Sequence, residues 1–213
     1  MLAAAAQAQP SSCSSDGAAQ PTALLERFIS ADCDTCWRDP QAPEPAAGTL
    51  AIDWVVEGSR GGDAPLSAVA TLDAGWRLEA IGRKPPAAAD SRFTQRAASG
   101  FKVRVAQGLP INDYIGTSIE MHPATQGPWK AWLLLVETLP KGTADSAVER
   151  NLVRNSFVAE WQPPKKGQPP RRYEIRSMQI PEGARRERLR VVGWLEDSQG
   201  KVRAIAQGRC PKG

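Results

Sequence analysis

The spacing of hydrophobic and polar positions changes near the middle of the chain. Before it, Thr49 to Val56 is almost continuously apolar, which predicts a buried strand, and the shorter run from Leu24 to Ile29 predicts another. From Phe101 onward, apolar residues alternate with charged ones, as in strands with one face in water. The pattern therefore predicts an α/β region followed by a series of strands.

Helices are expected between these two kinds of strand. Asp63 stands where an N-cap belongs, and Pro65 falls in the first turn. Apolar residues then follow at steps of three and four and define one helix face that ends near Gly82: Leu66, Val69, Leu72, Trp76 and Ala80. A second, weaker helix is expected from Ala87 to Ala98.

Strand patterns fill the rest of the chain, at 115–121, 131–138, 152–161, 172–180, 189–196 and 201–207. The fold class predicted is α+β. A thioredoxin-like α/β front unit at 22–98, possibly reduced in size, would pack against an antiparallel β-rich C-terminal unit at 99–210.

Residues 1–20 are rich in Ala, Ser and Gln and are expected to be disordered apart from Cys13. Within them, Ala6-Gln7-Ala8 has the small-x-small form of a signal-peptidase site, so we interpret this segment as the remnant of a signal peptide. A disordered Ala-rich terminus is the alternative. No stretch approaches the 18 apolar residues of a transmembrane helix. The expected location is therefore outside the cytosol, in the periplasm or the extracellular space.

Composition excludes few partners. The chain has 213 residues, and its net charge of +4 is too small to imply nucleic-acid binding. It contains no glycine-rich phosphate loop, no G-x-S-x-G and no H-E-x-x-H, so no cofactor is predicted. An unidentified protein or thiol is the expected partner, and the oligomeric state stays open.

Four cysteines agree with export, because disulfides form outside the cytosol. They allow three pairings. If Cys33 pairs with Cys36, then Cys13 pairs with Cys210 and ties the chain ends together, which would stabilise the fold by roughly 4–5 kcal/mol on the chain-entropy model. The other two pairings remain open.

The segment Cys33-Asp34-Thr35-Cys36 follows a predicted strand. A Cys-x-x-Cys in a βαβ setting is typical of a thioredoxin-like redox motif, in which Cys33 would be the attacking thiolate and Cys36 the resolving thiol. Structural disulfides and half-sites for zinc share this spacing. A zinc site would need further ligands, because His122 is the single histidine of the sequence.

The residues around the motif argue against a strong redox catalyst. Asp32, Asp34 and Asp39 add negative charge, which disfavours a thiolate, and Arg38 offsets only part of it. The prolines between Trp37 and Gly48 leave room for little more than one helical turn. Two functions therefore stay open: thiol–disulfide exchange, and a non-catalytic periplasmic or envelope-associated binding module in which the disulfide is structural.

Two further groups of polar residues are candidates. Asp53, in an otherwise apolar strand, could assist proton transfer to Cys36, or it could be a strand-end residue hydrogen-bonded to a loop. Arg150, Arg154 and Asn155 could bind an anion, or they could form the polar edge of a strand.

The segment from Leu25 to Cys36 (LERFISADCDTC) resembles the opening of an uncharacterised family of exported bacterial proteins, described as secreted and thioredoxin-like. Similar segments recur at 52–54, 148–155 and 191–204, so the resemblance covers most of residues 22–210. It implies a thioredoxin-like front and a β-rich rear.

The sequence also departs from that family. Trp37 stands where the family has proline after the second cysteine, and Asp32 stands where it has glycine. The resemblance implies a cis-proline opposite the motif, for which Pro85, Pro86 and Pro110 are the candidates.

Overall fold

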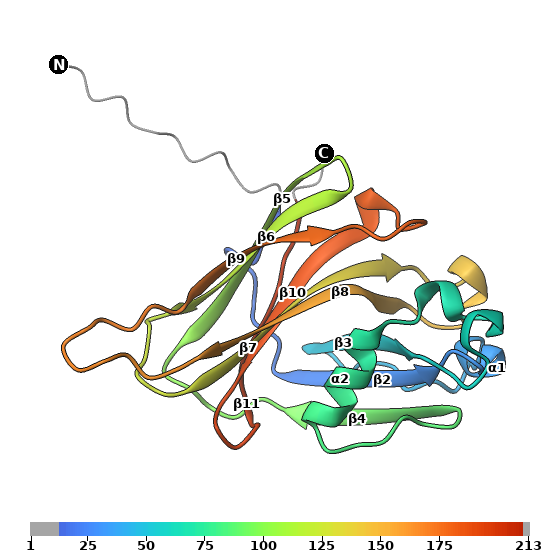
Figure 1. The fold of residues 1–213 in the computed structure, drawn as a ribbon, viewed down its shortest axis with the longest axis horizontal. Coiled ribbons are helices and arrows are strands. Elements are labelled where there is room, and N and C mark those ends of the chain that lie inside the picture. Colours follow the sequence, from blue (N-terminus) through green and yellow to red (C-terminus); the bar gives the residue numbers. More distant parts are fainter. Residues whose placement is uncertain (1–12, 211–213) are drawn as a thin grey trace.

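The computed structural model describes residues 13–210 and consists of two packed β-sheets with little helix (Figure 1). The larger sheet has seven strands in the order β11-β10-β7-β8-β3-β2-β4. Their bounds are β2 Ala23–Ser30, β3 Thr49–Val56, β4 Ala89–Gln95, β7 Trp129–Leu139, β8 Arg150–Trp161, β10 Leu189–Glu196 and β11 Val202–Gln207. The pairs β2–β3 and β3–β8 are parallel, and the other pairs are antiparallel.

The smaller sheet is antiparallel, in the order β1-β5-β6-β9. Its strands are β1 Cys13–Ser14, β5 Lys102–Ile111, β6 Tyr114–His122 and β9 Tyr173–Gln179. Residues of β5 and β6 such as Val105 and Ile119 pack with Leu133, Leu135 and Val191 of the larger sheet. This shared layer of apolar side chains holds the two sheets face to face.

The thioredoxin-like α+β fold class expected from the sequence is wrong. Strand makes up 45% of the structure and helix 13%, so the protein is mainly β. The front segment 22–98 contributes only β2, β3, β4 and two α-helices, α1 Asp34–Trp37 and α2 Leu72–Ala80. Those strands continue in one sheet with strands from 99–210, so the two expected units share a sheet and a core.

The expected helix at 63–82 is shorter, and a different face of it is buried. It starts after Thr71, whose side chain accepts a hydrogen bond from the N–H of Ala74, while the preceding residues form the 3₁₀ turns η1 Gly61–Asp63 and η2 Ser67–Val69. Leu78 is 1% exposed, whereas Leu72 is 59% and Trp76 61% exposed. The apolar stripe in the sequence therefore does not mark the face of α2 that packs on the sheet.

The contacts of Arg77 explain which face of α2 packs on the sheet. This arginine is fully buried and forms a two-bond ion pair with Glu26 of β2, at 2.7 and 2.8 Å, and a bond of 2.9 Å to Glu196 of β10. Its guanidinium also lies over the stacked rings of Trp132 and Trp194, 4.6 and 5.1 Å from their centres. Burial lowers the pKa of Arg77, but the two carboxylates more than offset this, so the pKa is raised and the side chain stays charged.

The second expected helix, from Ala87 to Ala98, is also wrong, because this segment forms β4. It pairs along its whole length with β2, from Ala89 opposite Ile29 to Gln95 opposite Ala23. The main-chain groups at the free edge of β2 need hydrogen-bond partners, and this requirement overrides the weak helical spacing.

The chain ends meet on the smaller sheet. Cys13 and Cys210 form a disulfide, which is one of the three pairings that the sequence left open. The expected disorder does not extend to residues 13–20, where Asp16 pairs with Arg104 and Gln20 donates to the carbonyl of Val103. The expected signal-peptide remnant lies mostly outside the described residues. In the part of the chain that is described, no helix is long and apolar enough to span a membrane.

Candidate functional site

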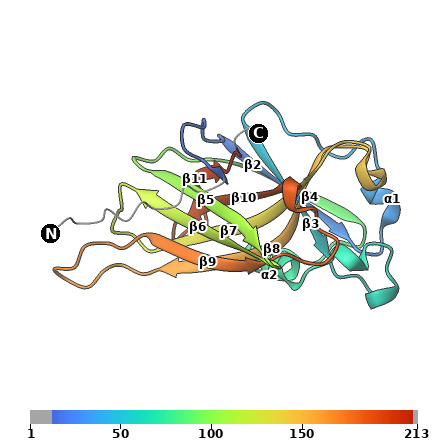
Figure 2. The ribbon, with the colours of Figure 1, turned by 90° about the horizontal axis from the view of Figure 1, so that it is seen from above.

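The second disulfide joins Cys33 and Cys36, at the end of the molecule where β2 and β3 finish and α1 lies (Figure 2). The chain leaves β2, forms the single turn of α1 and returns through the proline-containing segment 38–48 to the parallel strand β3. The expected strand–turn–strand setting of the motif is therefore present, although the helix has only four residues.

The two cysteines differ in their surroundings. Cys33 caps α1, and its Sγ is 3.2 Å from the N–H of Cys36 and 3.5 Å from the hydroxyl of Thr35. Cys36 packs against a buried apolar cluster that includes Ile29 and Trp37. Both side chains are partly exposed; we call Cys36 the inner cysteine because it contacts this cluster, and Cys33 the outer one.

The acidic residues beside the motif have partners of their own. Asp32 turns away from the disulfide and accepts hydrogen bonds from the N–H and hydroxyl of Ser59, at 2.7 and 2.8 Å, and from Arg60. These bonds, the Ser59 hydroxyl first, lower the pKa of Asp32. Asp34 forms an ion pair with Arg38. The charges of Asp32 and Asp34 are thus offset by arginines, whereas Asp39 accepts a hydrogen bond from the N–H of Gln41.

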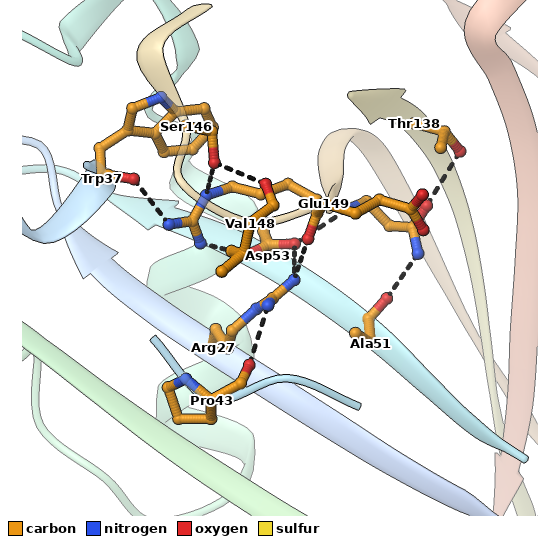
Figure 3. Close-up of polar contacts among 11 residues, drawn as sticks. Arg27, Trp37, Pro43, Ala51, Asp53, Thr138, Ser146, Val148 and Glu149 are labelled. Carbon is orange, nitrogen blue, oxygen red and sulfur yellow. Dashed lines mark hydrogen bonds and ion pairs between the residues drawn. The ribbon is translucent and has the colours of Figure 1, made fainter. Parts of the chain in front are cut away.

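A buried group of charges, drawn in Figure 3, contacts Trp37, the residue that follows the motif. Asp53 of β3 accepts a hydrogen bond of 2.7 Å from Arg27 of β2 and one of 2.8 Å from Arg150, the first residue of β8. A third comes from the N–H of Asn151, at 2.9 Å. Asp53 and Arg150 are 0% and Arg27 3% exposed. Two guanidinium groups share one carboxylate, so this charge cluster carries a net charge of +1.

The charge cluster also holds the segments around the disulfide. Arg150 donates to the carbonyl of Trp37 at 2.8 Å, and its guanidinium lies 4.5 Å from the centre of the Trp37 ring. Arg27 donates to the carbonyls of Pro43 and Glu149, at 2.9 and 3.0 Å. The start and the middle of the segment between Cys36 and β3 are thereby tied to charged side chains of the sheet.

The contacts of Asp53 match neither alternative considered from the sequence. Both of its carboxylate oxygens accept hydrogen bonds from cations, and none of the described contacts links it to Cys36. Asp53 lies in the middle of β3 and is a salt-bridged buried carboxylate. The three polar residues considered as an anion site do not form one: Arg150 joins the charge cluster, Arg154 pairs with Glu137, and Asn155 donates to the carbonyl of Gln179.

A cavity of about 270 Å³ lies between the disulfide and the charge cluster. Its lining includes Cys36, Arg27, Arg150, Asp39 and Ser91. We call it the Cys36 cavity. A second hollow of about 510 Å³ lies on the other side of α1, where Trp37 and Arg38 meet Leu66, Leu139, Arg185 and Arg188. Both cavities open next to the motif, so molecules could approach it from two sides.

The cis-proline expected opposite the motif is not at Pro85, Pro86 or Pro110. In residues 13–210 the cis peptide bond joins His122 to Pro123, after β6 in the smaller sheet. Over the same residues, no three His, Cys, Asp or Glu side chains lie close enough to hold a metal ion.

Sequence reasoning found the two cysteines and Asp53 but missed Arg27 as part of the site. One signal was available, because Glu26 and Arg27 interrupt the apolar run Leu24 to Ile29 on opposite faces of the strand. Charged residues on both faces of a buried strand need buried partners. Glu26 finds Arg77, and Arg27 finds Asp53.

No family model matches the chain, and neither curated proteins nor solved structures gave a match. The site is therefore interpreted from its own geometry.

Proposed function

We propose that this protein is an exported thiol–disulfide exchange protein in which Cys33 attacks and Cys36 resolves. The observation that supports this most is the Cys36 cavity, which Cys36 shares with two arginines of the buried charge cluster. The two carboxylates of the same lining have partners of their own: Asp90 pairs with Arg83, and Asp39 accepts a hydrogen bond from the N–H of Gln41. A positive charge next to a cysteine stabilises its thiolate, the reactive form in exchange.

The reaction requires no cofactor. A thiolate of the partner attacks the Sγ of Cys33, the Cys33–Cys36 bond breaks, and Cys36 leaves as a thiolate beside Arg27 and Arg150. The partner's second thiolate then attacks the partner sulfur that is bonded to Cys33, and Cys33 leaves as a thiolate. The partner dithiol loses two electrons and two protons, and the cysteine pair gains them. The reverse sequence, starting from the Cys33 thiolate, reduces a partner disulfide.

The size of the ring closed by each disulfide supports different roles for the two bonds. The cysteines of the motif are three residues apart in sequence, and Cys13 and Cys210 are 197 apart. On the chain-entropy model the motif bond stabilises the fold by ~2 kcal/mol and the terminal bond by ~5 kcal/mol. The fold therefore depends less on the motif bond, which can open at a smaller cost in stability.

The proposal is tested by trapping the first intermediate. In Cys36→Ser, Cys33 keeps its outer position but has no resolving thiol, so a disulfide-containing peptide should accumulate as a mixed disulfide on Cys33. Cys33→Ser is the matched variant, and we expect adduct formation there to be at least about tenfold slower, because Cys36 is the inner thiol. Equal adduct formation in both variants, or none in either, would contradict the proposal and favour a structural disulfide in a binding module.

A further inference from the structure

The hollow of about 510 Å³ beside α1, which we call the α1 groove, has an apolar floor. Trp37, Leu139 and Leu152 are buried there, whereas Leu66 and Val69 are only partly buried. Leu66 and Val69 belong to the apolar stripe that the sequence placed in a helix, but in the structure they lie at the turn η2 and line the groove. An apolar side chain of a bound partner would cover their exposed parts, and such burial favours binding.

The α1 groove adjoins the cysteine motif. Asp34 and Trp37 of α1 line it, and Asp34 follows Cys33 directly in the chain. Trp37, which follows Cys36, donates from its Nε1 to the carbonyl of Ala144 at 2.7 Å, so α1 is joined to another part of the lining. Because neighbouring Cα atoms are only about 3.8 Å apart, a partner chain in the groove would reach Cys33 within a few residues.

The acidic residues of the groove lining have arginine partners within the lining. Asp34 pairs with Arg38, and Glu137 pairs with Arg154. The third acid, Asp145, also acts on Arg38: the pKa of Arg38 is raised mainly by its hydrogen bond to Asp34 and further by the charge of Asp145. All three carboxylates are thus close to a cation of the groove.

Two further arginines of the groove lining are free. Arg185 is exposed and Arg188 partly exposed, and neither guanidinium has a hydrogen-bond or ion-pair partner among residues 13–210. Their main chain is held in place, because the N–H of Arg185 donates to Glu137 and the N–H of Arg188 donates to the carbonyl of Arg185. Four arginines and three carboxylates line the groove in all, so its net charge is positive. Charge complementarity therefore favours a ligand that carries a carboxylate.

We infer that the α1 groove binds the segment of a partner protein that contains the exchanging cysteine, and that this segment carries apolar and acidic side chains beside that cysteine. This inference rests on the proposed exchange function and names a substrate class for it. An apolar side chain would lie against Leu66 and Val69, and a carboxylate would accept hydrogen bonds from Arg185 and Arg188, while the partner cysteine meets Cys33. The groove volume of about 510 Å³ lies within the range of ligand sites, roughly 300–1,000 Å³, and holds part of such a segment.

The test uses full-length Cys36→Ser, in which Cys33 is the one cysteine outside the terminal disulfide. Its substrate is the peptide acetyl-Glu-Glu-Leu-Gly-Cys-Gly-Leu-Glu-Glu-amide, whose cysteine is joined to thionitrobenzoate. Attack by Cys33 on the peptide sulfur forms the mixed disulfide and releases the coloured thionitrobenzoate anion. The flanks of the peptide are symmetric, so either chain direction in the groove is served.

Two matched peptides replace every glutamate by glutamine, or every leucine by serine. We expect the original peptide to react about fivefold faster than either of them at low salt, since partly exposed ion pairs and partial apolar burial each contribute about that factor. High salt should reduce the preference for glutamate and leave the preference for leucine. Equal rates for all three peptides would overturn the inference.

A double variant locates the preference for glutamate. Arg185→Gln with Arg188→Gln, added to Cys36→Ser, should abolish it, and circular dichroism checks that the fold is kept. Lys165→Gln with Lys166→Gln is the matched control, because it removes the same charge from exposed residues outside the groove lining and should keep the preference. A preference that survives the arginine replacements, or that falls equally in both double variants, would overturn the inference.

Dithiothreitol separates this inference from the proposed function. Reduction of the Cys33–Cys36 bond by dithiothreitol in the folded wild-type protein, without a preference among the peptides, overturns the inference alone. Resistance of that bond to dithiothreitol in the folded protein overturns both.

Discussion

At the scale of single residues, the site is organised by buried charges. Arg27, Asp53 and Arg150 come from three strands and are almost completely buried. Removing one member of such a group leaves the others charged and unpaired in a medium of low polarity, which costs more than the ion pair itself contributes.

Asp53→Asn should therefore destabilise the protein by about 3–5 kcal/mol, because two buried guanidinium groups lose their shared carboxylate. Urea unfolding followed by circular dichroism measures this. Asp113→Asn is the matched control, since Asp113 pairs with Arg186 at the surface, where both side chains are at least half exposed. We expect a change of about 1 kcal/mol or less there. Equal losses in the two variants would argue against the charge cluster.

The lowered pKa of Asp32 predicts that the contacts of this carboxylate with the loop that precedes η1 depend on pH. Its pKa is lowered in the folded protein, so its stabilising contacts are fully present above the unfolded value of about 3.9 and disappear as the pH falls through the lower folded value. The amide NMR signal of Ser59, which donates to Asp32, should titrate with a midpoint below about 3.9. A midpoint at or above that value would contradict the assignment.

Gly58 provides a variant for the same contact. A Cβ at this position would lie 2.4 Å from the Asp32 carboxylate, so Gly58→Ala should displace Asp32 and raise the midpoint toward that of an ordinary aspartate. Gly62→Ala, in the adjoining turn η1, has nothing within 4 Å of its added Cβ and should leave the midpoint unchanged.

At the scale of elements, strands were predictable where the apolar pattern was strong, and helices were not. β3 has the predicted bounds, and β2 extends the predicted run by one residue at each end, because long apolar runs are buried in any arrangement of the sheet. The apolar stripe that includes Leu72 and Trp76 predicted the wrong face, because the buried face of α2 is set by Arg77 and its two carboxylates. Those partners are 51 and 119 residues away in sequence, so local spacing carries no signal of them.

Two leucine-to-alanine substitutions on α2 test which face of this helix is buried. Leu78→Ala should destabilise the protein by about 2–5 kcal/mol, since it leaves a cavity in the core. Leu72→Ala, at a position 59% exposed, should change the stability by about 0.5 kcal/mol or less. Thermal or urea unfolding distinguishes them, and the reverse order would support the helix face expected from the sequence.

At the scale of the whole molecule, the sequence limited the pairing of the four cysteines to three alternatives without choosing among them. The structure has Cys33–Cys36 and Cys13–Cys210, the alternative in which the motif closes on itself. The sharing of one sheet by the segments 22–98 and 99–210 was not predictable from the sequence. It depends on the contact of β3 with β8, where the parallel ladder pairs Asp53 with Leu152.

Replacing both terminal cysteines by alanine should cost ~5 kcal/mol, and replacing both motif cysteines ~2 kcal/mol, on the chain-entropy model. Urea unfolding of the two double variants checks this difference. An equal cost would mean that the motif bond supports the fold as strongly as the terminal bond.

The central claim is that the Cys33–Cys36 bond opens and closes in the folded protein. Its most direct test is a redox titration with dithiothreitol in which each cysteine is identified by alkylation and mass spectrometry, while circular dichroism follows the fold. We expect Cys33 and Cys36 to be reduced together at a poise where Cys13 and Cys210 remain oxidised and the β-sheet signal is unchanged. Reduction of Cys33 and Cys36 only together with unfolding, or only after the terminal bond, would contradict the claim.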